Sequence, residues 1–206
     1  MVSNEIVTGQ PPSPVEALTQ RLIDSGARPI WDIASIADEG QSEVLLGDRR
    51  LLITPNDVLF KKYVQAMSQA GLLHLENDSE LGDEEVAVTE IPRDARSITQ
   101  LLPGYPPIDG YGLHDAFSQI GEHISRLEAQ QGLAPTVGSL SLDKIIVVRT
   151  KADVMFTPGF ALEPFADTTN RGIIDSMHKQ LIPDYAKFGA AELIESLVTG
   201  LEHGTS

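Results

Sequence analysis

The sequence predicts an α+β protein, built as one domain or as two small lobes that share a core. Segments whose apolar residues recur every three or four positions predict helices, and short runs rich in Val, Leu and Ile predict strands. Helices and strands do not alternate strictly, so a parallel β-α-β sheet is not expected. The length of 206 residues and the apolar content of 41% are ordinary for a globular protein with a substantial core.

The start of the chain, residues 1–30, predicts a tail followed by one short helix. The tail ends in a Gly-Gln-Pro-Pro run, which favours irregular structure. We expect the helix to run from Ser13 to Ser25, because Ser13 can cap it and Pro14 suits the first helical position. Gly26 is expected to end it.

Residues 31–103 predict a β-rich part with one helix inserted. Two apolar runs, Val44–Leu46 and Leu51–Ile53, flank a polar Gly-Asp-Arg-Arg turn and predict a β-hairpin. A helix should follow from Asp57 to Ala70. One apolar face is predicted for this helix by Leu59, Phe60, Tyr63, Val64 and Met67.

The rest of the β-rich part predicts an acidic, solvated loop and one more strand. The acidic stretch Glu76–Glu90 matches no calcium-binding loop in its spacing. Alternating residues over Glu85–Ile91 predict a strand. Trp31, the only tryptophan, is expected to lie in the core.

Residues 104–206 predict a mainly helical part. Six Pro and Gly residues crowd Pro103–Gly112 and predict a hinge between two lobes. A long helix is expected over Leu113–Gln130, with Gly132 beyond its end. Its apolar face is expected to contain Leu113, Ala116, Phe117, Ile120, Ile124 and Leu127.

After the long helix, two short apolar strands predict a second hairpin, Lys144–Arg149 and Val154–Phe156. The chain from Asn170 onward predicts helices divided by Pro183. The last of these, Ala186–Glu202, has an apolar side whose simplest interpretation is core packing. The alternative is a surface for a protein partner around Leu197 and Leu201.

Charge and composition argue against several classes of partner. The formal charge of −15, from 30 acidic and 15 basic residues, predicts a surface that repels nucleic acid and anionic membranes. No apolar run approaches the roughly 20 residues that span a bilayer. The N-terminus lacks the basic start and apolar stretch of a secretory signal. With no cysteine, the chain is expected in the reducing cytoplasm.

The sequence contains no intact catalytic motif. The phosphate-binding loop, the dinucleotide-binding G-x-G-x-x-G, the zinc motif H-E-x-x-H and the hydrolase motif G-x-S-x-G are all absent. The five histidines are scattered along the chain. We therefore expect no metal site and no cofactor.

One stretch, Leu113–Leu162, resembles the catalytic core of the protein-kinase-like superfamily. That family has a long helix, a catalytic loop H-x-D-L-x-x-x-N, a short hairpin and then D-F-G. Here the loop is Val137–Lys144, and Thr157-Pro158-Gly159 stands at D-F-G. The residues that match small kinase-like phosphotransferases are Gly138, Leu140 and Gly159.

The N-terminal half agrees with this resemblance loosely. Gly40 and the residues after it look like a reduced nucleotide-loop hairpin, Leu51–Thr54 like the third strand, and Asp57–Ala70 like the helix that packs on it. The resemblance implies a two-lobed fold with a β-rich N-lobe and a helical C-lobe.

The residues that perform phosphotransfer in this family are substituted. Ser139 stands at the catalytic aspartate, Lys144 at the metal-binding asparagine and Thr157 at the D-F-G aspartate. The third strand has no lysine for the phosphates, and only Gly40 is left of the glycine loop. The resemblance therefore implies a catalytically inactive domain in which ATP binding is weak or absent.

Three functional interpretations follow. The leading one is an inactive kinase-like module that binds or regulates a protein partner. The second is an enzyme with an unrecognised site that uses Ser139, Asp143 or Lys144. The third is an unrelated α+β domain with an interaction or structural role.

Overall fold

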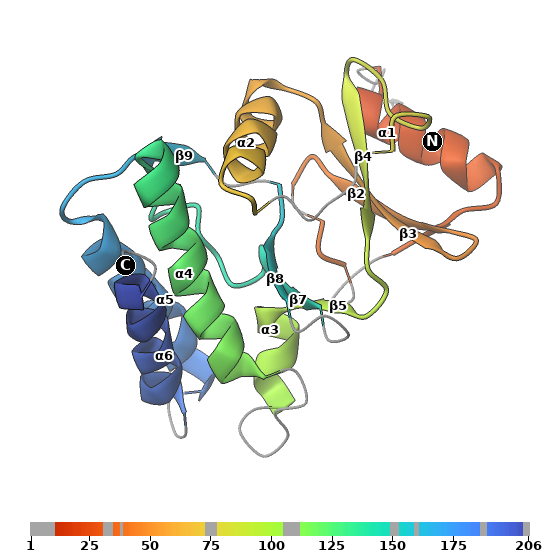
Figure 1. The fold of residues 1–206 in the computed structure, drawn as a ribbon. Helices are drawn as coiled ribbons and strands as arrows, with labels where there is room; N and C mark the ends of the chain where they lie inside the picture. The colour runs from red at the N-terminus through yellow and green to blue at the C-terminus, as the bar shows by residue number, and fades with distance from the viewer. Residues whose placement is uncertain are drawn as a thin grey trace, which may run out of the picture.

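The structure is a computed structural model, and it has the α+β architecture that the sequence predicts (Figure 1). It describes residues 11–30, 35–37, 39–72, 78–104, 112–148, 153–158, 161–185 and 189–203. Its elements, in chain order, are α1 (Pro14–Asp24), β1 (Arg28–Pro29), β2 (Ser42–Leu46), β3 (Arg49–Pro55), α2 (Val58–Gln69), β4 (Val86–Ile91), β5 (Ala95–Ser97), α3 (Ile98–Leu101), a 3₁₀ turn (Leu102–Gly104), α4 (Leu113–Gln131), β6 (Leu133–Pro135), β7 (Ile145–Val148), β8 (Asp153–Phe156), β9 (Leu162–Pro164), α5 (Thr169–Tyr185) and α6 (Ala190–His203).

The N-terminal sheet is antiparallel, with the strand order β1-β2-β3-β4. The β2–β3 hairpin is confirmed, but its turn is shorter than predicted. Leu46 pairs with Arg49, so only Gly47 and Asp48 form the turn, and Arg50 lies inside β3. Gly47 has φ +58°, a backbone conformation that a tight turn requires and that glycine adopts without strain. Charged side chains at the start of β3 made the strand look like part of a loop.

Helix α1 packs on one face of this sheet. Its start is stabilised as predicted, because Ser13 and Glu16 form a reciprocal capping box. The buried cluster between helix and sheet consists of Val15, Leu18, Leu22, Ala27, Val44, Leu51, Ile53, Val86 and Val88. Alternate residues of β2 and β3 face this cluster, so the residues between them face the other side of the sheet.

Helix α2 begins one residue later than predicted, with Asp57 as its cap. The Asp57 carboxylate accepts a hydrogen bond from the Phe60 amide at 2.8 Å. Phe60, Tyr63 and Met67 are buried as expected. Leu59 was predicted on the same face, but 63% of its surface is exposed, as is 81% of Val58, so this side of the first turn is not covered by a neighbouring element.

The C-terminal part combines helices with two small sheets. Strands β5, β7 and β8 form one antiparallel sheet, and β6 pairs with β9 in the other. Helix α4 buries the whole predicted face, and Gly132 follows its last residue with φ +61°. The hairpin turn at 149–152, most of the predicted hinge (105–111) and Trp31 lie outside the described residues.

The last two helices differ from the prediction in where they divide. Helix α5 continues through Pro183 to Tyr185, and α6 begins at Ala190 rather than at Ala186. A proline loses one hydrogen bond of its own, but the residues after it can still take helical dihedral angles. Among the described residues, no helix is long and apolar enough to cross a membrane.

Helices α4 and α6 pack with their backbones in close contact (Figure 1). A Cβ atom on Gly200 would lie 1.9 Å from the Ser118 carbonyl oxygen, and one on Gly121 would lie 2.4 Å from the Leu197 carbonyl oxygen. Both positions therefore require glycine for this approach. The Ser125 hydroxyl also donates to the Leu201 carbonyl at 2.7 Å.

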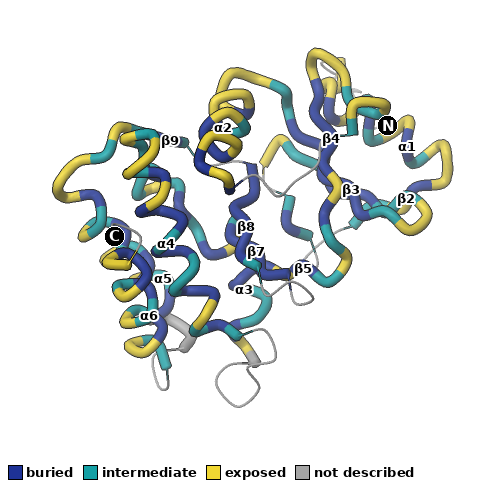
Figure 2. The backbone as a smooth tube through the Cα atoms, in the orientation of Figure 1, coloured by how far each residue is buried: buried dark blue, intermediate teal, exposed yellow. Residues whose placement is uncertain are grey.

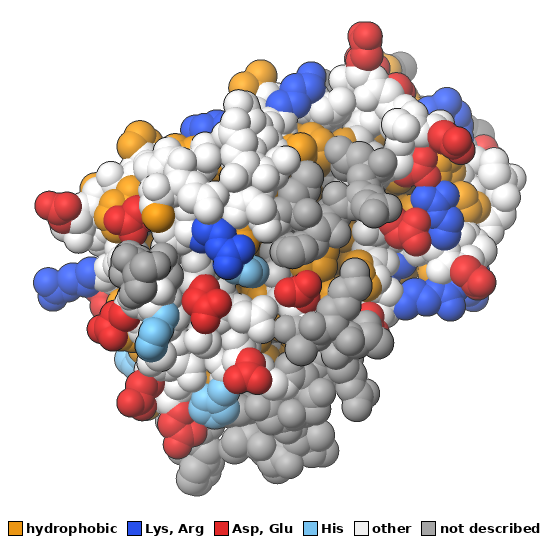
Figure 3. Space-filling model, in the orientation of Figure 1, with side chains coloured by type: hydrophobic (Ala, Val, Ile, Leu, Met, Phe, Trp, Pro, Cys, Tyr) orange, Lys and Arg blue, Asp and Glu red, His pale blue; other side chains and the backbone are white. Residues whose placement is uncertain are grey.

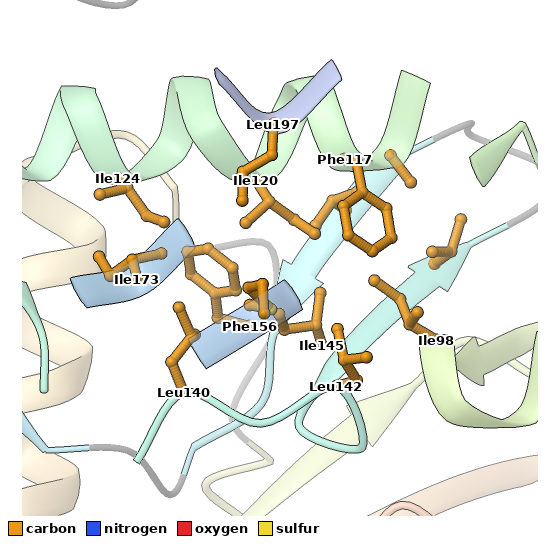
Figure 4. Close-up of a cluster of buried hydrophobic side chains, with 14 of the residues drawn as sticks. Ile98, Phe117, Ile120, Ile124, Leu140, Leu142, Ile145, Phe156, Ile173 and Leu197 are labelled. Carbon is orange, nitrogen blue, oxygen red and sulfur yellow. The ribbon is translucent and has the colours of Figure 1, made fainter. Parts of the chain in front are cut away.

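The predicted partner surface around Leu197 and Leu201 is therefore wrong. Leu197 is completely buried and Leu201 is only 5% exposed, because this side of α6 faces α4. Figure 4 shows Leu197 pointing toward Ile120 within the main hydrophobic cluster. The apolar periodicity of the helix correctly predicted an apolar face, and this face packs in the core.

Candidate functional site

The loop between β6 and β7, residues 136–144, corresponds to the predicted catalytic loop. The Ser139 amide and hydroxyl both donate to the Thr136 carbonyl, at 2.8 and 2.9 Å. Leu140 points into the main hydrophobic cluster (Figure 4) and is 2% exposed. Gly138, directly before Ser139, is exposed and has open space around it. The loop is thus anchored by one leucine and shaped by hydrogen bonds to its own backbone.

Thr157, at the predicted D-F-G position, directly follows β8 and is 2% exposed. Its amide and its hydroxyl both donate to the Lys144 carbonyl, each at 2.9 Å. The structure thus brings two of the predicted positions together, but through the backbone of Lys144. A threonine hydroxyl carries no charge, so this arrangement supplies no anionic ligand for magnesium.

The other predicted positions are distributed around this contact. Gly40 is exposed, with φ +77°, and precedes β2. Next to it, the Gln41 side chain donates to the Pro158 carbonyl at 2.6 Å, so the Gly40 and Thr157 segments lie close together. Gly159 lies outside the described residues.

The second interpretation required a nucleophile hydrogen-bonded to a base among Ser139, Asp143 and Lys144. The hydrogen bonds of Ser139 and Asp143 do not form such a pair. The Ser139 hydroxyl donates to backbone carbonyls, and the Asp143 carboxylate accepts the hydroxyl of Ser141. Within the described part of the chain, no group of three or more His, Asp or Glu residues could hold a metal ion.

The contact between the N-terminal sheet and the β7–β8 hairpin, called here the sheet–hairpin interface, is filled with apolar side chains. They come from β3, β4, β5, β7, β8 and the segment before β2, and each is at most 5% exposed. Figure 2 shows β7 and β8 as buried strands between the two halves. The members of this cluster are Ile36, Leu52, Ile91, Ala95, Ile146, Val148 and Met155.

Helix α2 is tied to the far end of the same hairpin. The Tyr63 hydroxyl, which is completely buried, donates to the Phe156 carbonyl. Burial raises the pKa of Tyr63 well above its usual value, so the phenol stays protonated and remains a donor. The residue before Tyr63, Lys62, donates through its ammonium to the Leu162 carbonyl at 2.9 Å.

A buried ion pair, which the sequence interpretation missed, borders the sheet–hairpin interface. Glu43 on β2 pairs with Arg50 on β3, and their side chains are 0% and 6% exposed. Glu43 also accepts from the Ser35 hydroxyl at 2.9 Å and the Ile36 amide at 2.7 Å. Arg50 donates to the Ala95 carbonyl at 2.8 Å. Because both side chains have further hydrogen-bonding partners, part of the cost of removing them from water is offset.

A signal for this pair was present in the sequence. Glu43 and Arg50 carry opposite charges, and each directly precedes one of the two apolar runs of the predicted hairpin. In the observed register, Arg50 lies opposite Leu45, two residues from Glu43, so the charges share one face. Assigning Arg50 to the turn concealed this relation.

A cavity of about 780 Å³ opens beside the ion pair. Its walls come from β2, β3, the segment from Arg93 to Pro103 and the end of the loop at Asp143. Its lining contains three arginines, Arg50, Arg93 and Arg96.

Two comparisons with known proteins give no match. No family model and no curated protein matches the sequence. The function must therefore be argued from the side chains and their geometry.

Proposed function

We propose that this chain is a kinase-like domain that has lost phosphotransfer and acts as a protein-interaction or regulatory module. The order of elements supports the resemblance. The long helix α4 is followed by the loop 136–144, the β7–β8 hairpin and then Thr157, as in the family. On this proposal the sheet β1–β4 with α1 and α2 is the N-lobe, and α4, α5 and α6 form the C-lobe.

The observation that carries the proposal is the packed sheet–hairpin interface. A kinase needs an open cleft between its lobes, because nucleotide and magnesium must enter between the glycine loop and the catalytic loop. Here the corresponding region contains Leu52, Ile91, Ile146 and Met155, all buried, together with the Glu43–Arg50 pair. On this proposal, these side chains fill the position that a nucleotide takes in a kinase.

The substituted positions support the same conclusion. Ser139 and Thr157 direct their hydroxyls to backbone carbonyls, and neither can replace an ionised carboxylate. Lys144 would bring a positive charge to a metal-binding position. Strand β3 has the sequence RRLLITP and offers no lysine to the phosphates.

The hydrogen bonds between the two proposed lobes favour a fixed module over an enzyme that must open. Gln41 reaches Pro158, and Tyr63 reaches Phe156, both across more than 90 positions of sequence. Catalytic kinases close and open around their substrates. A module whose lobes are joined in this way suits recognition by a partner protein.

The test measures ATP binding by isothermal titration calorimetry, with and without magnesium. We expect no heat of binding and no rise in melting temperature, since a ligand of the folded state would stabilise it by mass action. Micromolar, magnesium-dependent binding of ATP would contradict the proposal. Autophosphorylation would also overturn it.

A double variant sharpens this test. Ser139→Asp and Lys144→Asn restore two of the family's polar residues at partly buried positions of the loop. If the packed interface excludes the nucleotide, the double variant should still fail to bind ATP. Binding gained by the variant would show that the substitutions alone prevented it. Far-UV circular dichroism should confirm that wild type and variant are equally folded.

A further inference from the structure

We infer that the cavity beside the Glu43–Arg50 pair binds a small organic anion, an apolar body that carries one carboxylate or phosphate group. This inference uses the cavity alone and goes beyond the kinase-like proposal, which predicts no ligand. The described residues that line the cavity belong to the hairpin, the segment 93–103 and two loops. The ones that matter for recognition are Ile30, Leu45, Arg93, Arg96, Pro103 and Asp143.

The size of the cavity suits a small molecule. Its volume of about 780 Å³ falls inside the range of roughly 300–1,000 Å³ that is typical of ligand sites. Ile30, Leu45 and Pro103 supply apolar wall, while Ser97 and Gln100 add polar groups. A mostly apolar site with a few polar groups in fixed places is the usual composition of such sites.

Three arginines line the cavity in a protein that is otherwise acidic. Arg50, Arg93 and Arg96 line it, against the single carboxylate of Asp143 among its described lining residues. The whole chain carries a formal charge of −15. On the face drawn in Figure 3, acidic and basic side chains are interspersed. No ion pair with a described carboxylate involves Arg96, whereas Arg50 and Arg93 are both paired, so Arg96 is the charge that favours an anionic ligand.

Two of these arginines are already used by the fold. Arg50 is neutralised by Glu43, and Arg93 pairs with Asp48 at 2.9 Å and donates to the Asp48 carbonyl at 2.6 Å. Their role is to form and hold the wall of the cavity. They are not the groups that we expect to contact the ligand first.

Arg96 is the residue best placed to hold the anion. It donates through Nη1 to the carbonyls of Arg93 at 3.1 Å and Ala95 at 2.8 Å, and no carboxylate in the described part of the chain pairs with it. These two hydrogen bonds orient the guanidinium but leave its charge uncompensated. Since a guanidinium has five N–H donors, Nε and Nη2 can still present a fork to a carboxylate or phosphate.

The composition of the wall decides between an organic anion and a bare ion. A free phosphate would gain from Arg96 but would leave the walls at Ile30 and Leu45 in contact with water. An apolar body attached to the anion removes that surface from water and so adds to the affinity. A large polyanion is disfavoured, because the net charge of the chain would repel it.

The test compares three probes by calorimetry: 1-naphthyl phosphate, 1-naphthol and inorganic phosphate. We expect 1-naphthyl phosphate to bind most tightly, because it alone offers both the apolar body and the anion. Arg96→Gln should weaken its binding about tenfold, the value of one charge-assisted hydrogen-bond pair. Asp143→Asn should strengthen binding, because it removes the one repelling carboxylate of the lining.

The control is Arg126→Gln, which makes the same change of charge on an exposed position of α4 outside the cavity. It should leave the affinity unchanged, and matched melting temperatures should show that all three variants are folded. Equal binding of naphthol and naphthyl phosphate would overturn the anion site. Equal losses of affinity in Arg96→Gln and Arg126→Gln would show that the overall charge of the protein, and not a contact at Arg96, controls binding, and this would also contradict the inference. If none of the three probes binds, the inference is wrong.

Discussion

The α4–α6 helix pair and the sheet–hairpin interface are both buried, but they are built on different principles. Between the helices, Gly121 and Gly200 let two backbones meet, and leucines fill the remaining space. Beside the sheet–hairpin interface, an ion pair is buried and a cavity of about 780 Å³ lies next to it. The helix pair therefore depends on close packing, whereas the interface combines apolar packing with satisfied polar groups at its border.

This difference indicates where binding can be coupled to the fold. A close-packed helix pair has no room for a ligand, and changes there alter stability alone. A buried polar network with an adjoining cavity can change its hydrogen bonding when a ligand enters. Regulation by a partner or ligand is thus expected at the interface rather than at the C-terminal helices.

The largest effect is expected from breaking the buried ion pair. Glu43→Ala leaves Arg50 charged and buried without its carboxylate, and it should lower the free energy of unfolding by about 3–5 kcal/mol. Urea denaturation followed by circular dichroism measures the change. The double variant Glu43→Leu/Arg50→Met is the control, and it should lose less than Glu43→Ala does. A larger loss in the double variant would show that volume, and not charge, dominates here as well.

The next effect tests the helix pair. Gly200→Ala introduces a methyl group where the Ser118 carbonyl lies 1.9 Å away, so the helices must separate. Overpacking of this kind should cost about 1–3 kcal/mol, even though alanine favours helix by about 1 kcal/mol over glycine. Thermal unfolding measures the loss.

Gly138→Ala is the matched control, because no atom lies within 4 Å of the added methyl group. Its stability should stay within about 0.5 kcal/mol of wild type. If Gly200→Ala were as stable as Gly138→Ala, the close contact between α4 and α6 would not be a constraint on the fold.

A smaller effect is expected at Thr157. Thr157→Val keeps the shape of the side chain but removes the hydroxyl that donates to the Lys144 carbonyl. That carbonyl still accepts the Thr157 amide, so the loss should be about 1 kcal/mol. Chemical denaturation gives the value, and Thr169→Val, another buried threonine, provides a comparison. A loss as large as that of Glu43→Ala would contradict a purely local role for Thr157.

The smallest effect is expected from an ion pair at the surface, between Arg49 and Asp78. The Arg49 hydrogen bond holds the pKa of the Asp78 carboxyl below its usual value. The pair therefore contributes stability above the unfolded pKa, near 3.8, and loses it as the pH falls through the lower folded pKa. Because Arg49 is 40% exposed, the contribution should stay below about 1 kcal/mol.

Asp78→Asn should remove this part of the acid dependence and leave the stability at neutral pH only slightly lower. Denaturation midpoints measured between neutral pH and the acid range test it. An unchanged acid dependence in Asp78→Asn would assign the titration to other carboxylates.

Several elements were predictable from the sequence because their causes are local. Ser13 and Asp57 cap helices through contacts three residues away, and Gly132 follows the last residue of α4 with a positive φ. The buried face of α4 follows from its 3.6-residue period, which survives in any surroundings that offer an apolar neighbour. The α+β class followed from these elements together.

The candidate site was predictable only in part. The positions Ser139, Lys144 and Thr157 were identified from their spacing in the sequence, and the structure joins the last two through a backbone carbonyl. The apolar cluster of the sheet–hairpin interface could not be predicted. Its members come from segments as far apart in the sequence as Ile36 and Met155. Contacts between such distant segments are not encoded in any local pattern.

The sequence alone therefore determined the longer helices and the strands of the two hairpins. The tertiary structure decided which apolar faces are covered, and it placed Leu197 and Leu201 in the core rather than on a partner surface. It also decided that Glu43 and Arg50 are buried together. The physical reason is that periodicity identifies an apolar face, whereas burial depends on which distant element packs against that face.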